Sequence, residues 1–131
     1  KQKINPVALV EILYEFFNFY NLVLDDLEKR PSEFTVRFNL KNLHQGGVKT
    51  GLAPFAPGTY GHLFDHDKKE APDDAMTIQK RFPTEGYDST AYAYAMAKEI
   101  YLWFGLEEDK IPYVKEENGG KFVDVAKIKG I

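Results

Sequence analysis

The 131-residue sequence contains no cysteine. This absence excludes disulfide bonds, thiolate catalysis and zinc sites built from cysteine. Serine is scarce too: Ser32 and Ser89 lie at expected helix or strand boundaries, where capping explains them better than nucleophilic catalysis. No uninterrupted apolar run approaches the roughly 20 residues that span a bilayer, and the Lys-Gln-Lys start shows no signal-peptide pattern. We therefore expect no membrane partner, no cofactor and a cytoplasmic location.

The chain carries a net charge of −3, which does not favour binding to nucleic acid or to an anionic membrane. Basic pairs do occur at 68–69 and 80–81. Because exposed aromatic rings beside basic strands can stack on bases, an accessory domain of a nucleic-acid-associated protein stays open as an alternative. Nucleic acid is nevertheless not the partner we expect for this domain alone.

Composition favours an ordinary globular domain, with 44% hydrophobic and 28% charged residues. A single α+β domain over residues 1–131 is the simplest expectation at this length. The aromatic share is high at 15%, and these large side chains should supply much of the core. The chain begins with Lys1 rather than methionine, so we expect it to be excised from a longer multidomain protein.

Periodicity predicts two long helices. The first is capped by Asn5 and should run to about Glu28. The second is capped by Asp88 or Ser89 and should end at Gly105, which can adopt the left-handed conformation of a helix end.

Both helices carry more apolar residues than a single core-facing stripe needs. In the first helix the predicted core stripe comprises Leu9, Ile12, Leu13, Phe16, Phe19, Tyr20, Val23 and Leu27. In the second helix it comprises Ala93, Tyr94, Ala97, Ile100, Tyr101 and Phe104. The apolar residues beyond these stripes predict a surface for a protein partner, formed by Tyr14, Phe17, Leu24, Tyr92, Met96 and Trp103. The alternative is that the two helices cover each other's extra rows.

Alternation of apolar and polar residues predicts strands at 33–40 and 75–82. The segment 75–82 would also suit a short helix, and we favour the strand because the alternation extends over all of it. Two shorter strands, 111–116 and 121–126, flank Asn118-Gly119-Gly120, a strong hairpin signal. This order predicts an α+β fold of two layers, in which two long helices pack on a largely antiparallel sheet of about four strands.

Residues 43–67 form a long irregular loop between the first two predicted strands. This loop holds all three histidines and five of the ten glycines. Long irregular segments are uncommon in compact domains and are often functional. The loop is therefore the first place to expect a ligand or a catalytic site.

A metal site in this loop would use His44, His62, Asp65 and His66. His62 and His66 have the i, i+4 spacing of two ligands on one helix face. The zinc-protease pattern needs glutamate directly after the first histidine, and Leu63 occupies that place. A small metal-assisted hydrolytic enzyme is therefore an alternative rather than the leading reading.

The loop also contains Gly-Gly-Val-Lys-Thr-Gly at 46–51, a composition that could cradle a phosphate. The phosphate-loop pattern needs glycine directly before the lysine, where this chain has valine, so a plain turn is favoured. If the loop contacts a small ligand, the residues expected to do so are Gly46, Gly47, Lys49, Thr50 and Tyr60.

No residue pattern predicts a catalytic centre. The leading expectation is a non-catalytic interaction or regulatory domain of a larger intracellular protein. It would bind a protein partner, a neighbouring domain or a second copy of itself through apolar helix faces.

Overall fold

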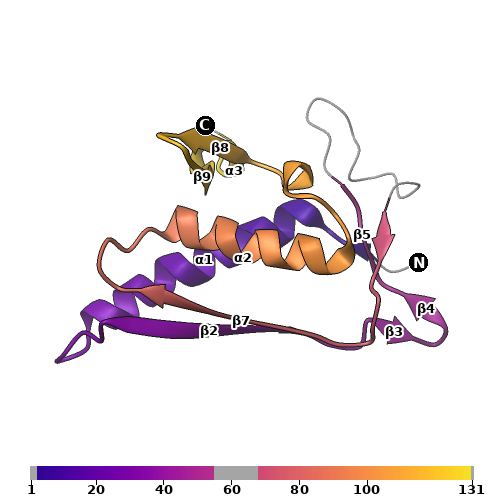
Figure 1. Ribbon diagram of the computed structural model, residues 1–131, viewed down its shortest axis with the longest axis horizontal. Coiled ribbons are helices and arrows are strands. Elements are labelled where there is room, and N and C mark those ends of the chain that lie inside the picture. The colour runs from indigo at the N-terminus through magenta and orange to yellow at the C-terminus, as the bar shows by residue number, and fades with distance from the viewer. Residues whose placement is uncertain (1–2, 55–67, 131) are drawn as a thin grey trace.

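The computed structural model describes residues 3–54 and 68–130 and has a mixed α+β fold (Figure 1). Two long helices, α1 (Pro6–Asp25) and α2 (Ser89–Phe104), pack on each other. Two eight-residue strands, β2 (Glu33–Leu40) and β7 (Met76–Pro83), pair along their whole length as an antiparallel ribbon. The prediction of a strand at 75–82 is confirmed.

The caps of both helices follow the sequence signals. The Asn5 side chain accepts hydrogen bonds from the amides of Val7 and Ala8 at 3.0 and 3.2 Å. Asp88 does the same for α2, and Gly105 ends that helix at a φ of 87°. Helix α1 ends at Asp25 rather than near Glu28. Its last turn tightens instead, because the amides of residues 26 and 27 bond three residues back.

The four predicted strands are not confirmed as one sheet. The C-terminal strands β8 (Val114–Glu117) and β9 (Gly120–Val123) pair with each other, through a turn in which Asn118 and Gly119 have positive φ. This hairpin packs on α2, and α2 lies between it and the β2–β7 ribbon (Figure 1). Chain 124–126, predicted as strand, instead leads into the short helix α3 (Val125–Ile128).

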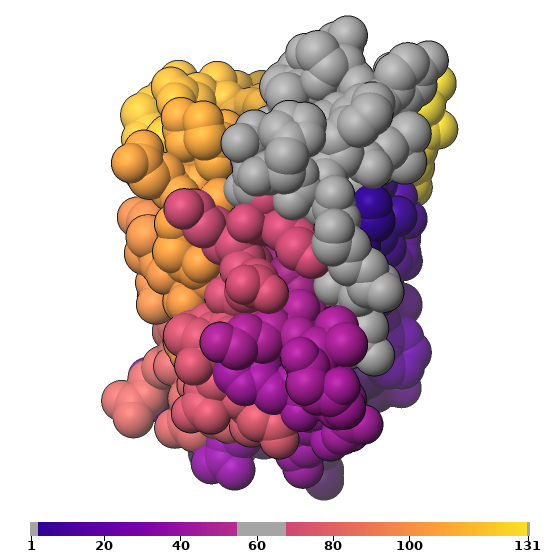
Figure 2. Space-filling model, turned by 90° about the vertical axis from the view of Figure 1, so that its right-hand side faces the viewer, coloured from indigo at the N-terminus to yellow at the C-terminus, as the bar shows by residue number. Residues whose placement is uncertain are grey.

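The rest of the described chain forms small pairings at one end of the molecule. Strand β1 (Lys3–Ile4) pairs with β5 (Gly51–Leu52), which also pairs with β6 (Lys69–Glu70). Strands β3 (His44–Gln45) and β4 (Val48–Lys49) form a two-residue hairpin. The first part of the segment predicted as irregular is therefore paired backbone. At the end shown in Figure 2, the magenta surface of β3–β4 lies beside the segment leading into β7.

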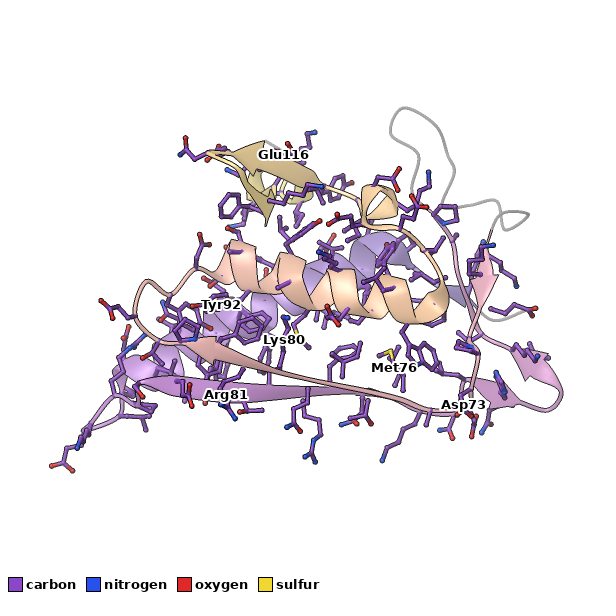
Figure 3. The ribbon with its side chains drawn as sticks, in the orientation of Figure 1. Asp73, Met76, Lys80, Arg81, Tyr92 and Glu116 are labelled. Atoms are coloured by element: carbon purple, nitrogen blue, oxygen red, sulfur yellow. The ribbon has the colours of Figure 1, made fainter. Side chains whose placement is uncertain are left out.

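An aromatic cluster joins both helices to the ribbon. Phe17 of α1 meets Phe82 of β7 edge-on at 5.2 Å and Tyr92 of α2 at 5.8 Å between ring centroids. Phe34 of β2 lies 5.7 Å from Phe82. Figure 3 shows Tyr92 and Met76 in the space between α2 and the ribbon. The predicted core stripe of α2 is confirmed, because all six of its residues are buried.

The predicted core stripe of α1 is wrong in most of its positions. The buried residues of this helix are Pro6, Leu9, Val10, Leu13, Phe17 and Leu24. Phe17 and Leu24 were expected outside the core stripe, and Val10 belongs to the same row of the helix. The predicted core residues Ile12, Phe16, Phe19, Val23 and Leu27 are exposed. Both rows are apolar and partly aromatic, so periodicity alone could not decide which of them packs on α2 and the ribbon.

Candidate interaction surface

An exposed apolar stripe runs along α1. We define the α1 stripe as Ile12, Phe16, Phe19 and Val23 of α1 together with Leu27, which lies two residues beyond the end of the helix, and with Leu22 beside them. These six side chains belong to the eight large hydrophobic residues that are exposed in the described part of the chain. Phe19 is 65% exposed and Ile12 is 60% exposed. Single exposed apolar residues are ordinary, but several of them gathered on and directly after one helix make a candidate interaction surface.

The opposite side of α1 is fixed in the core, which holds the α1 stripe in one orientation. The Tyr87 hydroxyl donates a hydrogen bond to the Phe17 backbone carbonyl at 2.6 Å. The Phe16 ring stacks on Tyr20 with centroids 5.9 Å apart and planes 8° from parallel. Tyr20 in turn contacts Phe34 of β2 at 5.1 Å. These contacts hold α1 in place, so the exposed residues of the α1 stripe have a fixed orientation relative to the rest of the fold.

Carboxylates border the α1 stripe on one side. Glu15 lies three residues after Ile12 and four before Phe19, so all three share neighbouring positions on the helix surface. Asp26 lies three residues after Val23 and forms the helix C-cap. Arg30, the nearest arginine along the chain, is engaged elsewhere: it contacts Asp25 at 2.6 Å and Asn21 at 3.1 Å.

Helix α1, at 20 residues, is long and apolar enough to cross a membrane by length and composition alone. The core helix of a water-soluble protein passes the same test. One face of α1 packs on α2 and on aromatic residues of the ribbon, and 28% of the apolar window of α1 is buried.

The residues predicted as an interface lie mainly inside the protein. Phe17, Leu24 and Met96 are fully buried, so no partner reaches them while the fold is intact. Tyr14, Tyr92 and Trp103 are partly buried and pack against the core. The Phe17–Tyr92 ring contact agrees, for these two residues, with the alternative that each helix covers the other's extra row. The exposed side chains of α1 belong to the row that was predicted as core.

Of the candidate metal residues, His44 alone lies within the described chain, so the structure does not test this site. His62, Asp65 and His66 lie outside the described residues. The His44 ring donates from Nε2 to the Ala71 carbonyl at 2.7 Å, and the His44 amide donates to Asp74 at 2.8 Å. Within residues 3–54 and 68–130, no group of three acidic or histidine side chains could hold a metal ion.

The candidate ligand residues of the same segment have structural roles where they are described. Gly46 and Gly47 turn the β3–β4 hairpin with φ values of 58° and 79°. Such values are costly for other residues, which explains the glycines without a phosphate. Lys49 pairs with His44 across the hairpin, and Thr50 is buried. Tyr60 lies outside the described residues.

The outer face of the ribbon is polar and cross-linked within itself. Arg37 donates two hydrogen bonds to Gln79 at 3.1 and 3.0 Å, and Thr77 donates one to Asn39 at 2.7 Å. These pairs are typical of a solvated antiparallel face. These side chains bond to one another, so they give no support for nucleic-acid binding by this face. Nucleic-acid binding stays an untested alternative.

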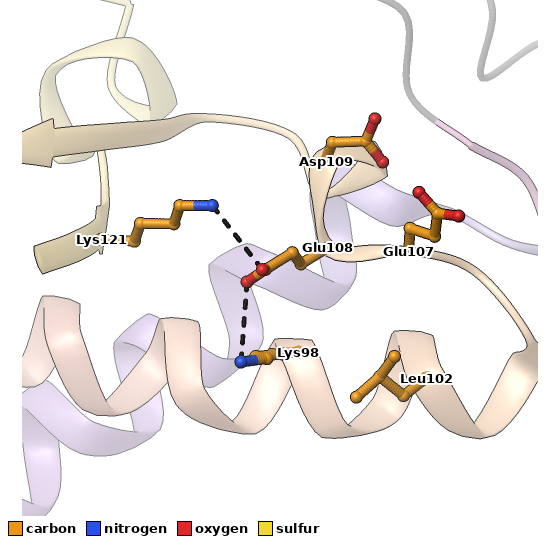
Figure 4. A pocket seen from close by; sticks show the side chains of 6 residues that line it. All are labelled: Lys98, Leu102, Glu107, Glu108, Asp109 and Lys121. Carbon is orange, nitrogen blue, oxygen red and sulfur yellow. Dashed lines mark ion pairs between the residues drawn. The ribbon is translucent and has the colours of Figure 1, made fainter.

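Sequence reasoning missed a charged hollow of about 430 Å³ between α2, the hairpin and η2 (Glu108–Lys110) (Figure 4). Glu108 lies at its centre, 3.7 Å from both Lys98 and Lys121, and accepts a hydrogen bond from the Tyr94 hydroxyl. The Tyr94 hydrogen bond, with the two lysines, lowers the pKa of Glu108 below its ordinary value. A carboxylate with a lowered pKa is a poor general base at neutral pH, so this network is better explained as a tether between η2, the hairpin and α2.

Comparison with protein-family models, curated proteins and solved structures found no match for this chain.

Proposed function

We propose that this chain is a non-catalytic interaction or regulatory domain of a larger intracellular protein, and that it binds a helix of a protein partner through the α1 stripe. The observation that carries the proposal is that, of the eight large hydrophobic residues exposed in the described part of the chain, six lie within residues 12–27. Burying such a group is the main source of favourable free energy in protein association.

The spacing within the α1 stripe supports a helical occupant. Its four residues within α1 lie at intervals of four, three and four, and Leu27 follows two residues beyond the end of the helix. Alternating intervals of three and four produce a straight apolar seam, into which side chains of a second helix can interdigitate. Recognition of an amphipathic helix by such a surface is a recurrent mode of peptide binding.

The charges of α1 favour a protein over a lipid surface. Helices that lie in a membrane interface are usually rich in lysine and arginine on their polar face. The polar edge of α1 instead carries Glu11 and Glu15. Insertion across a membrane would also remove Leu13, Phe17 and Leu24 from the core, each of which contributes about 1.5–3 kcal/mol by its burial.

The proposal includes the two-layer arrangement that the sequence predicts. We propose that α1 and α2 together form one layer on the inner face of the β2–β7 ribbon. Aromatic contacts from α1 and α2 to β2 and β7 support this arrangement. In it, the core uses one side of α1 and leaves the α1 stripe to a partner.

A designed probe tests the proposal without a known partner. The probe is a helical peptide with leucine at the same four-three-four spacing and neutral polar residues elsewhere. The double variant I12Q/F19Q removes two exposed side chains of the α1 stripe, and glutamine retains helix propensity. The control L102Q removes an apolar side chain of α2 that is 52% exposed and lies outside the α1 stripe.

We expect the peptide to bind the unchanged protein and L102Q with equal affinity, and I12Q/F19Q at least about tenfold more weakly. Fluorescence anisotropy measures the affinity, and circular dichroism verifies that all three proteins are folded. Equal binding to all three proteins, or binding to none, would overturn the proposal.

The metal-assisted enzyme remains an untested prediction, because three of its four residues lie outside the described chain. No observation in the described chain favours it over the interaction domain.

A further inference from the structure

The α1 stripe has an acidic border formed by Glu15 and Asp26, with Glu11 one turn before Glu15. Glu11 and Glu15 are four residues apart, so their carboxylates lie on the same side of α1. Like charges at this spacing repel each other and destabilise a helix. Within residues 3–54 and 68–130, the ion pairs found do not include Glu11, Glu15 or Asp26.

The charge imbalance extends over the whole of α1 and the turn that follows it. Residues 6–30 contain five acidic and two basic side chains, a net charge of −3. One of the two basic residues, Arg30, is held by Asp25 and Asn21. Charge is depleted at the centre of most interfaces and retained at their rim. The position of Glu15 and Asp26 beside the α1 stripe is that of a rim.

We propose that the helix bound by the α1 stripe carries lysine or arginine on the side of its apolar face that meets Glu15 and Asp26. This inference rests on the proposed function and specifies the partner. Complementary charge across a rim steers association, fixes the register of two helices and excludes wrong partners.

The same border argues against a second copy of this chain as the occupant. In a two-fold symmetric pair the same patch of each copy meets the other. Antiparallel pairing of two α1 helices would bring Glu15 of one copy near Asp25 and Asp26 of the other, and parallel pairing would bring Glu15 beside Glu15. Either arrangement adds like charges, whereas a basic partner removes the repulsion already present.

Two further peptides test the charge of the partner. Both keep the leucine seam of the neutral probe, and they carry either lysine or glutamate beside it. Rim charge pairs are individually weak and are screened by salt. We expect the lysine peptide to bind the unchanged protein about tenfold more tightly than the glutamate peptide at low salt, and this ratio to fall as salt is added.

In the double variant E15Q/D26N, the ratio between the affinities of the lysine and glutamate peptides should fall. What remains should be the small ratio that the overall negative charge of the protein produces. The matched control E70Q/E107Q removes the same charge from two exposed residues elsewhere, on β6 and before η2. We expect this control to keep most of the tenfold preference. A lysine preference that is absent, or that E15Q/D26N and E70Q/E107Q reduce equally, would overturn the inference.

The outcomes separate this inference from the proposed function. If the neutral peptide binds and the I12Q/F19Q variant does not, the proposed function stands even when the charge preference fails. If no peptide binds, the proposed function itself fails. Sedimentation equilibrium and vesicles of phosphatidylcholine with phosphatidylserine test the other occupants. A dimer, or vesicle binding, that is lost in I12Q/F19Q would overturn the commitment to a basic helix.

Discussion

Phe16 and Phe17 are adjacent in α1 but occupy opposite environments. Phe16 is 43% exposed, whereas Phe17 is fully buried, and their rings meet edge-on with centroids 5.2 Å apart. Consecutive helical residues point about 100° apart, so the boundary between the core and the α1 stripe passes between these two rings. Helix α1 therefore has two apolar faces: the core covers one, and the other is exposed.

The two faces should differ in what they contribute to stability. Substitution F17A should lower the free energy of unfolding by about 3–5 kcal/mol, because it leaves a cavity among Phe82 and Tyr92. Substitution F19A removes a ring that is 65% exposed and should change it by about 0.5 kcal/mol or less. Urea denaturation measures both values. A comparable loss for the two variants would show that the α1 stripe is part of the core.

The Y87F variant removes the hydrogen bond from the Tyr87 hydroxyl to the Phe17 carbonyl, and its effect should appear in the free energy of unfolding. At neutral pH the variant should be less stable by about 1 kcal/mol. Burial, followed by the neighbouring Tyr92 and Tyr20, raises the pKa of Tyr87 to about 12. Because the raised pKa belongs to the folded state, the stability it confers is present below pH 10 and is lost as pH rises through about 12.

The stability difference between Y87F and the unchanged protein should therefore narrow from pH 10 upward. Denaturant unfolding at neutral pH and in that alkaline range measures it. If the stability difference between the two proteins stays constant across this range, the pKa of Tyr87 is not raised in the folded state, and the prediction is wrong.

Glu108 should make the protein sensitive to acid. The hydrogen bond from Tyr94 lowers the pKa of Glu108 below its ordinary value of 4.5. Its contribution to stability is thus present above pH 4.5 and is lost as pH falls through the lowered pKa of the folded state. The E108Q variant should show a smaller loss of melting temperature between neutral and acidic pH than the unchanged protein. The neighbouring E107Q serves as the control, and equal acid sensitivity in E107Q and E108Q would contradict this role.

The cap of α2 gives a further check on the fold. Asp88 accepts hydrogen bonds from the Thr90 and Ala91 amides at 3.0 and 3.2 Å, and from the Thr90 hydroxyl at 2.6 Å. Substitution D88A should cost about 1 kcal/mol, within the range of about 0.5–2 kcal/mol for such caps. Thermal unfolding measures this loss. An unchanged melting temperature would mean that α2 does not begin at Ser89.

Local signals in the sequence were reliable where the cause is local. Asn5 and Asp88 cap their helices as predicted, Gly105 ends α2, and Asn118-Gly119 turns a hairpin. The strand at 75–82 was recognised because its alternation matches the pleat of the ribbon.

The assignments that depend on tertiary packing were less successful. Two apolar rows on α1 are of similar composition, and only the positions of α2 and β2 decide which is buried. The separation of β8–β9 from β2–β7 likewise depends on α2 being covered on both sides. The candidate surface was predicted on the wrong row for the same reason. Phe17 and Leu24 lie in the core, whereas Phe16 and Phe19 are exposed.

Chemical-shift mapping by nuclear magnetic resonance tests the central claim most directly. The lysine-bordered helical peptide is titrated into the isotopically labelled protein, and amide and methyl shifts are followed. The account predicts that the largest changes fall on residues 12–27, at Ile12, Phe16, Phe19, Val23 and Leu27, with smaller changes on the outer face of β2–β7. Largest changes on that outer face, on the β8–β9 hairpin or around Glu108 would contradict it.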